Sequence, residues 1–216
     1  MTARRAAALK LAFGCAVLVV PPLAYHALVV ARGGSALTVG LGWLATLVGV
    51  YAIGRVARLP LPALALALAA AAGLWAVTAG TALGIYLMPV ATWLALLTLF
   101  ACTLAPGREP LVAAIARICH GGIDAPIAAY ARRVTIAWCV FFASMATTLA
   151  AAALVMPLAA WSFLANVAAL PLVAVMFAVE YAVRRRRFPD LEHVPPLEMV
   201  ARLSRAGWSF VAAPAR

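Results

Sequence analysis

The segment FAVEYAVRRRRFPDLEH, residues 177–193, places one carboxylate, Glu180, in an apolar run that ends in four consecutive arginines. Glu180 precedes Arg184 by one helical turn, in the order that favours an ion pair along a helix. A carboxylate facing the interior of a membrane bundle is also a candidate functional group, because ionisable residues are costly in lipid. Asn166 lies nearly four helical turns before Glu180, so both are expected on one polar face of the same helix. The ion-pair and functional interpretations of Glu180 both remain open.

Other chemically active residue types lack matching partners in the sequence. His26 has no carboxylate at comparable depth, which favours a hydrogen bond to a carbonyl over a proton relay. Cys119, His120 and Asp124 are close together, but zinc sites need paired ligands at set spacing and no second cluster exists. There is no Ser/His/Asp arrangement, phosphate-binding loop or HExxH pair. We therefore predict no metal ion, no cofactor and no catalytic residue.

The composition indicates the surroundings of these residues. Hydrophobic residues make up 67% of the 216 residues and charged residues 11%, whereas soluble domains have roughly 45–50% and about 25%. Such a chain cannot cover its surface with polar groups, so lipid must be part of its solvent. We expect one all-α, polytopic membrane bundle. We therefore expect the cations behind the net charge of +11 to lie at the ends of the membrane spans, and we do not infer nucleic-acid binding from them.

Six apolar runs are long enough to cross a bilayer, which takes about 20 residues per helix. They cover about residues 11–31, 37–53, 61–78, 85–104, 134–154 and 158–183. A basic start also suits a secretory leader, but apolar sequence continues past the proline pair without a small-x-small cleavage site. This favours a kinked first span within a bundle of residues 1–183. A loop covers residues 105–133, and a basic tail covers 184–216.

The basic residues indicate the orientation of the bundle. Six spans put both termini on one side, and of the 17 Lys and Arg residues Arg32 alone falls on the other side. The positive-inside rule then predicts both termini in the cytoplasm. A cytoplasmic basic patch is expected from Arg132, Arg133, Arg184, Arg185, Arg186 and Arg187.

Two stripes of apolar residues indicate further packing. Leu111, Ile115 and Ile118 recur at helical spacing, which predicts a short helix in the loop, lying either at the bilayer surface or against the bundle. Trp138, Phe141, Phe142 and Met145 follow an i, i+3, i+4, i+7 pattern typical of a packing or lipid-facing stripe.

The stretch RRVTIAWCVFF, residues 132–142, together with EYAVRRRR, residues 180–187, resembles a family of small bacterial inner-membrane proteins. These are encoded in loci for aryl polyene (xanthomonadin-like pigment) and related fatty-acid-type synthesis. The resemblance is clearest over residues 110–187, and its motif residues are Arg133, Val134, Thr135, Trp138, Cys139 and Phe142. It implies an inner-membrane location beside carrier-protein-dependent synthesis, attachment or export. It transfers no catalytic residue.

These observations favour a non-catalytic docking or accessory component. Its cationic side is expected to attract anionic lipid headgroups and an acidic acyl carrier protein or cytosolic synthesis enzymes. The alternative is a transporter or flippase subunit for a lipid-linked product, working through the face of Asn166 and Glu180. A membrane acyl- or glycosyl-transfer enzyme needs polar residues gathered at one depth, and here they are scattered.

Overall fold

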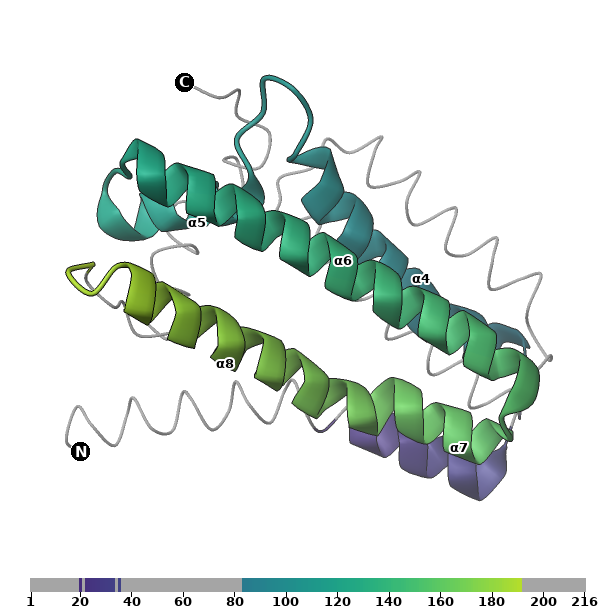
Figure 1. Ribbon diagram of the computed structural model, residues 1–216. Coiled ribbons are helices and arrows are strands. Elements are labelled where there is room, and N and C mark those ends of the chain that lie inside the picture. The colour runs from purple at the N-terminus through teal and green to yellow at the C-terminus, as the bar shows by residue number, and fades with distance from the viewer. Residues whose placement is uncertain (1–19, 21, 34, 36–82, 192–216) are drawn as a thin grey trace, which may run out of the picture.

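The computed structural model describes residue 20, residues 22–33, residue 35 and residues 83–191. Every regular element in this part of the chain is a helix, so the all-α prediction is confirmed there (Figure 1). The elements are α4 (Leu83–Cys102), α5 (Leu111–His120), α6 (Ala125–Val155), α7 (Leu158–Phe163), the π-helix η1 (Leu164–Ala168) and α8 (Ala169–Arg187). Residues 22–32 are also helical.

Three of these helices are long and apolar enough to cross a membrane. They are α4, α6 and the continuous helix Leu158–Arg187, which comprises α7, η1 and α8. They correspond to the predicted runs 85–104, 134–154 and 158–183. The runs 37–53 and 61–78, the beginning of the first run and most of the basic tail lie outside the described residues. Six spans therefore remain a prediction.

Two of these helices extend beyond the predicted runs at the same end. α6 begins at Ala125, before residue 134, with Pro126 in its first turn, where the missing N–H of proline costs no hydrogen bond. The last helix continues to Arg187 rather than ending at residue 183. Arginine is a good helix former, and cations in a last turn interact favourably with the helix dipole.

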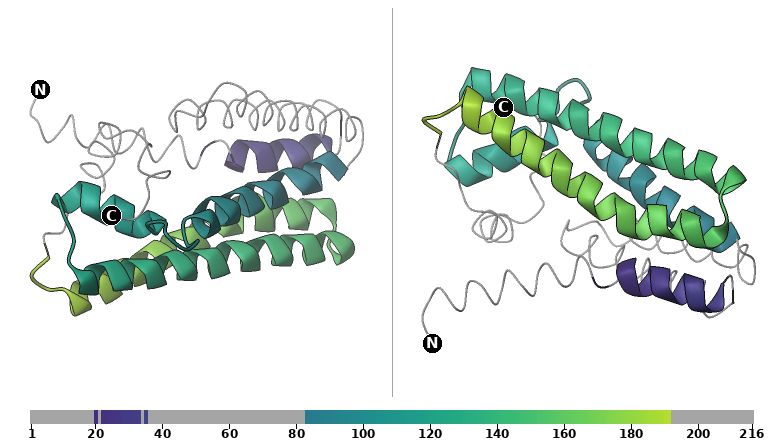
Figure 2. Two further views of the ribbon diagram at one scale, coloured as in Figure 1. Left: turned by 90° about the horizontal axis from the view of Figure 1, so that it is seen from above. Right: turned by 60° about the horizontal axis from the view of Figure 1, so that its bottom comes forward.

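α6 is the helix against which α4 and α5 pack (Figure 2). Its aromatic stripe faces α4: the Phe142 ring lies 5.0 Å from that of Phe100 and 6.0 Å from that of Trp93, between ring centroids. Trp138 and Phe142 are buried. The stripe is therefore a packing stripe, as one of the two interpretations predicted.

α5 lies against the bundle in the described structure. Leu111 and Ala114 are buried, with Ile115 and Ile118 beside them, against Leu99 and Phe100 of α4. The apolar side of α5 is thus covered by protein. Of the two arrangements considered for this loop helix, packing on the bundle is the one observed.

Candidate docking site at the arginine end

The beginning of α6 and the end of α8 meet at one end of the bundle (Figure 1). The ring of Tyr130 in α6 lies 5.4 Å from that of Phe188, which follows α8, between centroids. We call this region the arginine end; its cations are Arg108, Arg117, Arg132, Arg133, Arg184, Arg185, Arg186 and Arg187. Arg32 belongs to the helix of residues 22–32, which lies alongside α7 towards the other end (Figures 1 and 2).

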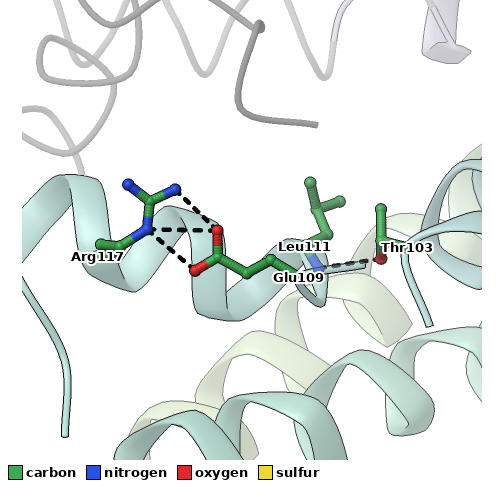
Figure 3. Close-up of polar contacts among 4 residues, drawn as sticks. All are labelled: Thr103, Glu109, Leu111 and Arg117. Atoms are coloured by element: carbon green, nitrogen blue, oxygen red, sulfur yellow. Dashed lines mark hydrogen bonds and ion pairs between the residues drawn. The ribbon is translucent and has the colours of Figure 1, made fainter. Parts of the chain in front are cut away.

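Arg117 is held by an ion pair within the α5 region (Figure 3). Its Nε donates to both carboxylate oxygens of Glu109 at 3.0 and 3.3 Å, and its Nη2 donates to Oε2 at 2.7 Å. The hydrogen bond with Glu109 raises the pKa of Arg117. The pair ties the beginning of α5 to its last turn, so Arg117 has a structural partner.

Two further arginines bind carbonyl groups at the end of α4. Arg108 Nη1 donates to the Cys102 carbonyl at 3.4 Å, and Arg132 Nη2 donates to the Leu104 carbonyl at 3.3 Å. Carbonyls at a helix C-terminus lack partners within the helix and carry partial negative charge. These two guanidinium groups therefore help to fix the connection between α4 and α5.

Glu180 forms the ion pair expected from its spacing to Arg184. Arg184 Nε lies 3.2 Å from Glu180 Oε1, although the alignment is not that of a hydrogen bond and this buried Nε has no hydrogen-bond partner. The side chains retain 16% exposure at Glu180 and 29% at Arg184. The Tyr130 hydroxyl donates to the backbone carbonyl of Glu180 at 3.4 Å. The observed geometry is therefore that of a helix-end ion pair.

Seven of the eight arginines of this end are exposed. Three of them, Arg108, Arg117 and Arg132, make the contacts described above; the other four are Arg133, Arg185, Arg186 and Arg187. Among the described residues, the acids of the same end are Glu109 and Glu180, which pair with Arg117 and Arg184, and the exposed Asp124 and Asp190. Positive charge is therefore in excess in the described part of this surface, and three of the exposed cations occupy one helical turn at the end of α8. A short, dense array of guanidinium groups is suited to binding carboxylates or phosphates.

Two buried threonines fix α5 beneath this surface. Thr103 Oγ1 accepts a hydrogen bond from the Leu111 amide at 3.0 Å (Figure 3), and Thr135 Oγ1 accepts one from the Val112 amide at 3.3 Å. The residue before α5 is Pro110, which provides no side-chain cap. The amides of Leu111 and Val112, in the first turn of α5, are thus capped by a side chain that follows α4 and by one in α6. Thr103 was not identified from the sequence, because its partner Leu111 is eight residues away, across an irregular segment.

The motif residues of α6 divide between packing and surface. Val134, Thr135, Trp138 and Phe142 are buried, Cys139 is half-buried and Arg133 is exposed. Thr135 also donates to the Ala131 carbonyl at 2.9 Å. Most of this motif therefore joins α6 to α4 and α5, and Arg133 is its member at the charged surface.

Asn166 belongs to a separate buried polar cluster at the π-helix. Its Nδ2 donates to the Ser162 carbonyl at 3.0 Å and to the Ser162 hydroxyl at 3.3 Å. The Ser162 Oγ lies 3.1 Å from His26 Nδ1, so the partner of His26 is a hydroxyl rather than a carbonyl. A side chain that occupies a helix carbonyl in this way interrupts the regular backbone ladder. The cluster joins the helix of residues 22–32 to the last helix.

The structure does not bring Asn166 and Glu180 together. Fourteen residues of helix separate them by about 21 Å along the axis, and their partners differ: Asn166 bonds Ser162, whereas Glu180 pairs with Arg184. Ser162 was not identified from the sequence, since its link to His26 spans 136 positions. A joint site for the two predicted polar residues is not formed.

Within the described residues, no group of three or more His, Cys, Asp and Glu side chains is arranged to hold a metal ion. His120 Nδ1 lies 2.8 Å from the Ala116 carbonyl, an intrahelical contact. The Cys119–His120 pair is therefore engaged at the end of α5.

No protein-family model matches the chain, and no curated protein and no solved structure is significantly similar to it.

Proposed function

We propose that the chain is a six-span, multi-pass protein of a bacterial inner membrane with both termini in the cytoplasm. We further propose that it is a non-catalytic accessory component of aryl-polyene or fatty-acid-type lipid synthesis, whose arginine end docks acidic cytosolic partners. An acidic acyl carrier protein or synthesis enzyme is the expected partner. The link to this synthesis depends on the resemblance of residues 132–142 and 180–187.

The observation that carries the docking proposal is the exposed pair Arg185 and Arg186 at the end of a long, regular helix. Guanidinium groups on a helix end have a fixed spacing, which favours specific recognition of carboxylates over diffuse attraction. Neighbouring arginines of this end hold α4, α5 and α8 through Leu104, Glu109 and Glu180. The helix end that carries Arg185 and Arg186 is thus fixed by contacts among the neighbouring helices.

The charge distribution supports the cytoplasmic assignment of this end. Every described arginine except Arg32 belongs to the arginine end, the asymmetry expected when one side of a bundle remains in the cytoplasm. By contrast, the flippase alternative relies on a face shared by Asn166 and Glu180, which are about 21 Å apart along the helix. No described contact favours that alternative.

The docking proposal is tested by capturing partners from native membranes with the full chain and with the double variant Arg185→Gln/Arg186→Gln. We expect recovery of an acidic cytosolic protein to fall roughly three- to tenfold, because each exposed charge contributes at most about 1 kcal/mol. Arg32→Gln, at the other end, and the charge-preserving Arg185→Lys/Arg186→Lys are the matched controls. Equal recovery with the wild type and the double Gln variant would refute docking at this pair.

The orientation is tested with a reporter fused after Arg216. We expect activity in the cytoplasm, both for the wild type and for the double Gln variant, so that loss of partner cannot be attributed to an inverted topology. A reporter active only in the periplasm would contradict the cytoplasmic location of the arginine end, and with it docking of cytosolic partners there.

A further inference from the structure

Two aromatic residues of the last helix contact α6 from either side of the π-helix η1. Before η1, the buried Trp161 donates its indole N–H to the Leu149 carbonyl at 2.9 Å. After η1, the Phe177 ring lies 4.7 Å from that of Trp138, between centroids. An uninterrupted α-helix turns about 100° per residue, so Trp161 and Phe177 would point about 160° apart. They would then point in nearly opposite directions, and only one of them could face α6.

The π-helix removes this mismatch. η1 (Leu164–Ala168) is a single wide turn, whose hydrogen bonds span five residues instead of four, so it takes up one residue more than an α-helical turn. With that residue taken out of the count, the angle between Trp161 and Phe177 falls to about 60°. The wide turn therefore directs α7 and α8 towards the same neighbour, α6.

The side chain of Asn166 occupies the acceptor that a regular helix would use. In an α-helix, the Ser162 carbonyl accepts the backbone N–H of the residue four positions later, which is residue 166. Here it accepts Asn166 Nδ2 at 3.0 Å, and the same Nδ2 lies 3.3 Å from Ser162 Oγ. Both residues are buried. A side-chain donor that competes for a helix carbonyl favours an interrupted helix over a regular one.

The same serine connects the wide turn to another helix. Ser162 Oγ lies 3.1 Å from Nδ1 of His26, which belongs to the helix of residues 22–32. The His26 ring also contacts the Phe163 ring edge-on, with 5.8 Å between centroids. The position of Ser162 is therefore fixed from within the last helix by Asn166 and from outside it by His26.

We propose that the buried polar cluster of His26, Ser162 and Asn166 sets the register of the last helix, and with it the direction of the arginines at the other end. Without the cluster, η1 becomes an ordinary α-helical turn. Every later residue then moves into the place of its successor, about 100° around the axis and about 1.5 Å along it. Arg185 then points where Arg186 points now. This inference goes beyond partner docking and does not depend on it.

The cluster acts over a long distance because a helix transmits rotation along its whole length. From Asn166 to Arg185 the helix rises about 28 Å, close to the roughly 30 Å hydrocarbon core of a bilayer. In the shifted register, Arg187 takes the place in which Phe188 now contacts the Tyr130 ring. The shift therefore loses a ring contact at the arginine end, whereas η1 regains regular hydrogen bonds. Asn166 acts as a positioning residue that decides between the two registers.

The register is measured on the full chain in nanodiscs by pulsed electron paramagnetic resonance. One spin label is placed at Arg133→Cys in α6 and the other at Arg185→Cys or Arg186→Cys, all exposed positions, after removal of the four native cysteines. A turn of 100° moves a side chain by about 8 Å on a helix about 10–12 Å wide. In Asn166→Leu, we expect the 133–185 distance to become that of the 133–186 pair in the wild type.

Deletion of Ala168 from the Asn166→Leu variant should restore the register without the amide. It removes the extra residue, so an uninterrupted α-helix directs Trp161 and Phe177 as in the wild type, and both distances should return. A loss of stability alone would not be repaired by removing a residue. Ser144→Leu is the matched control, because the Ser144 hydroxyl also bonds the carbonyl four residues earlier, that of Val140, at 2.8 Å, but within the regular α6. It should change neither distance.

Wild-type distances in Asn166→Leu would overturn the proposal, and so would failure of the deletion to restore them. If Asn166→Leu does not accumulate in membranes, recovery of folded protein on deletion of Ala168 supports the register role, and no recovery overturns it. His26→Phe keeps a ring against Phe163 and should add a second population at the shifted distance; a single wild-type population would contradict the role of His26. The distances are recorded without a partner, so docking can fail while this proposal stands.

Discussion

Replacing Thr103 by Val should release the first turn of α5 from the bundle. Valine has nearly the shape of threonine but no acceptor, so the buried Leu111 amide, now bonded at 3.0 Å, would lose its partner. A buried donor left unsatisfied costs about 1–3 kcal/mol, and loss of an N-cap costs about 1 kcal/mol. We expect hydrogen exchange of α5 amides to become at least about fivefold faster, as about 1.4 kcal/mol corresponds to a factor of ten and about 1 kcal/mol to a factor of five.

Thr135→Val gives a graded comparison at the neighbouring amide. The Val112 bond is longer, at 3.3 Å, so a smaller increase of about threefold is expected, corresponding to roughly 0.7 kcal/mol. The matched control is Thr98→Val, because the Thr98 hydroxyl of α4 is exposed and donates only to the Leu94 carbonyl of its own helix. Exchange measured by mass spectrometry over the peptide of α5 checks all three variants. Unchanged exchange in Thr103→Val, or an equal rise in Thr98→Val, would refute the capping argument.

Three further predictions concern the last helix. Trp161→Phe keeps an aromatic ring but loses the hydrogen bond of the indole N–H to the Leu149 carbonyl at 2.9 Å. It should lower the free energy of unfolding by about 1 kcal/mol in a detergent-unfolding titration. An unchanged unfolding midpoint would contradict a stabilising role for this hydrogen bond. Asn166→Ala removes a buried donor from the Ser162 carbonyl and should cost about 1–3 kcal/mol in the same titration, whereas a neutral result would show that this amide is dispensable. Glu180→Gln removes a partly exposed ion pair and should cost less than about 1 kcal/mol, with a difference from wild type that shrinks as salt rises; a salt-independent loss would indicate a different role for the carboxylate.

The helices that the sequence predicted best are those with a simple hydropathy signal. α4 and the last helix are continuous apolar runs, and α5 follows from the spacing of Leu111, Ile115 and Ile118. The beginning of α6 was missed because residues 125–133 mix apolar residues with two arginines, which resembles a cytoplasmic loop. Local composition predicts the presence of a helix better than it predicts the ends of that helix.

Polar contacts between residues close in the sequence were also easier to predict than contacts between distant residues. The ion pair of Glu180 with Arg184 follows from a spacing of four residues. The contact of His26 with Ser162 and the threonine caps of α5 depend on how helices pack, which a single sequence does not encode as spacing. The π-helix was also missed, since Leu164–Ala168 has an ordinary apolar composition and the interruption is tied to the amide of Asn166.

The lengths of the helices determine where α5 lies relative to the bilayer. α4 has 20 residues, α6 has 31 and the last helix has 30, or about 30, 46 and 45 Å. A hydrocarbon layer of about 30 Å matches α4 alone, so the two longer helices must tilt or rise above the layer by up to about 15 Å. They extend past the predicted runs at the end where α5 packs. In the proposed membrane arrangement, that end is a rigid helical platform at the height of the lipid headgroups. Cations carried on such a platform keep fixed positions relative to one another, and a flexible tail with the same charges would not.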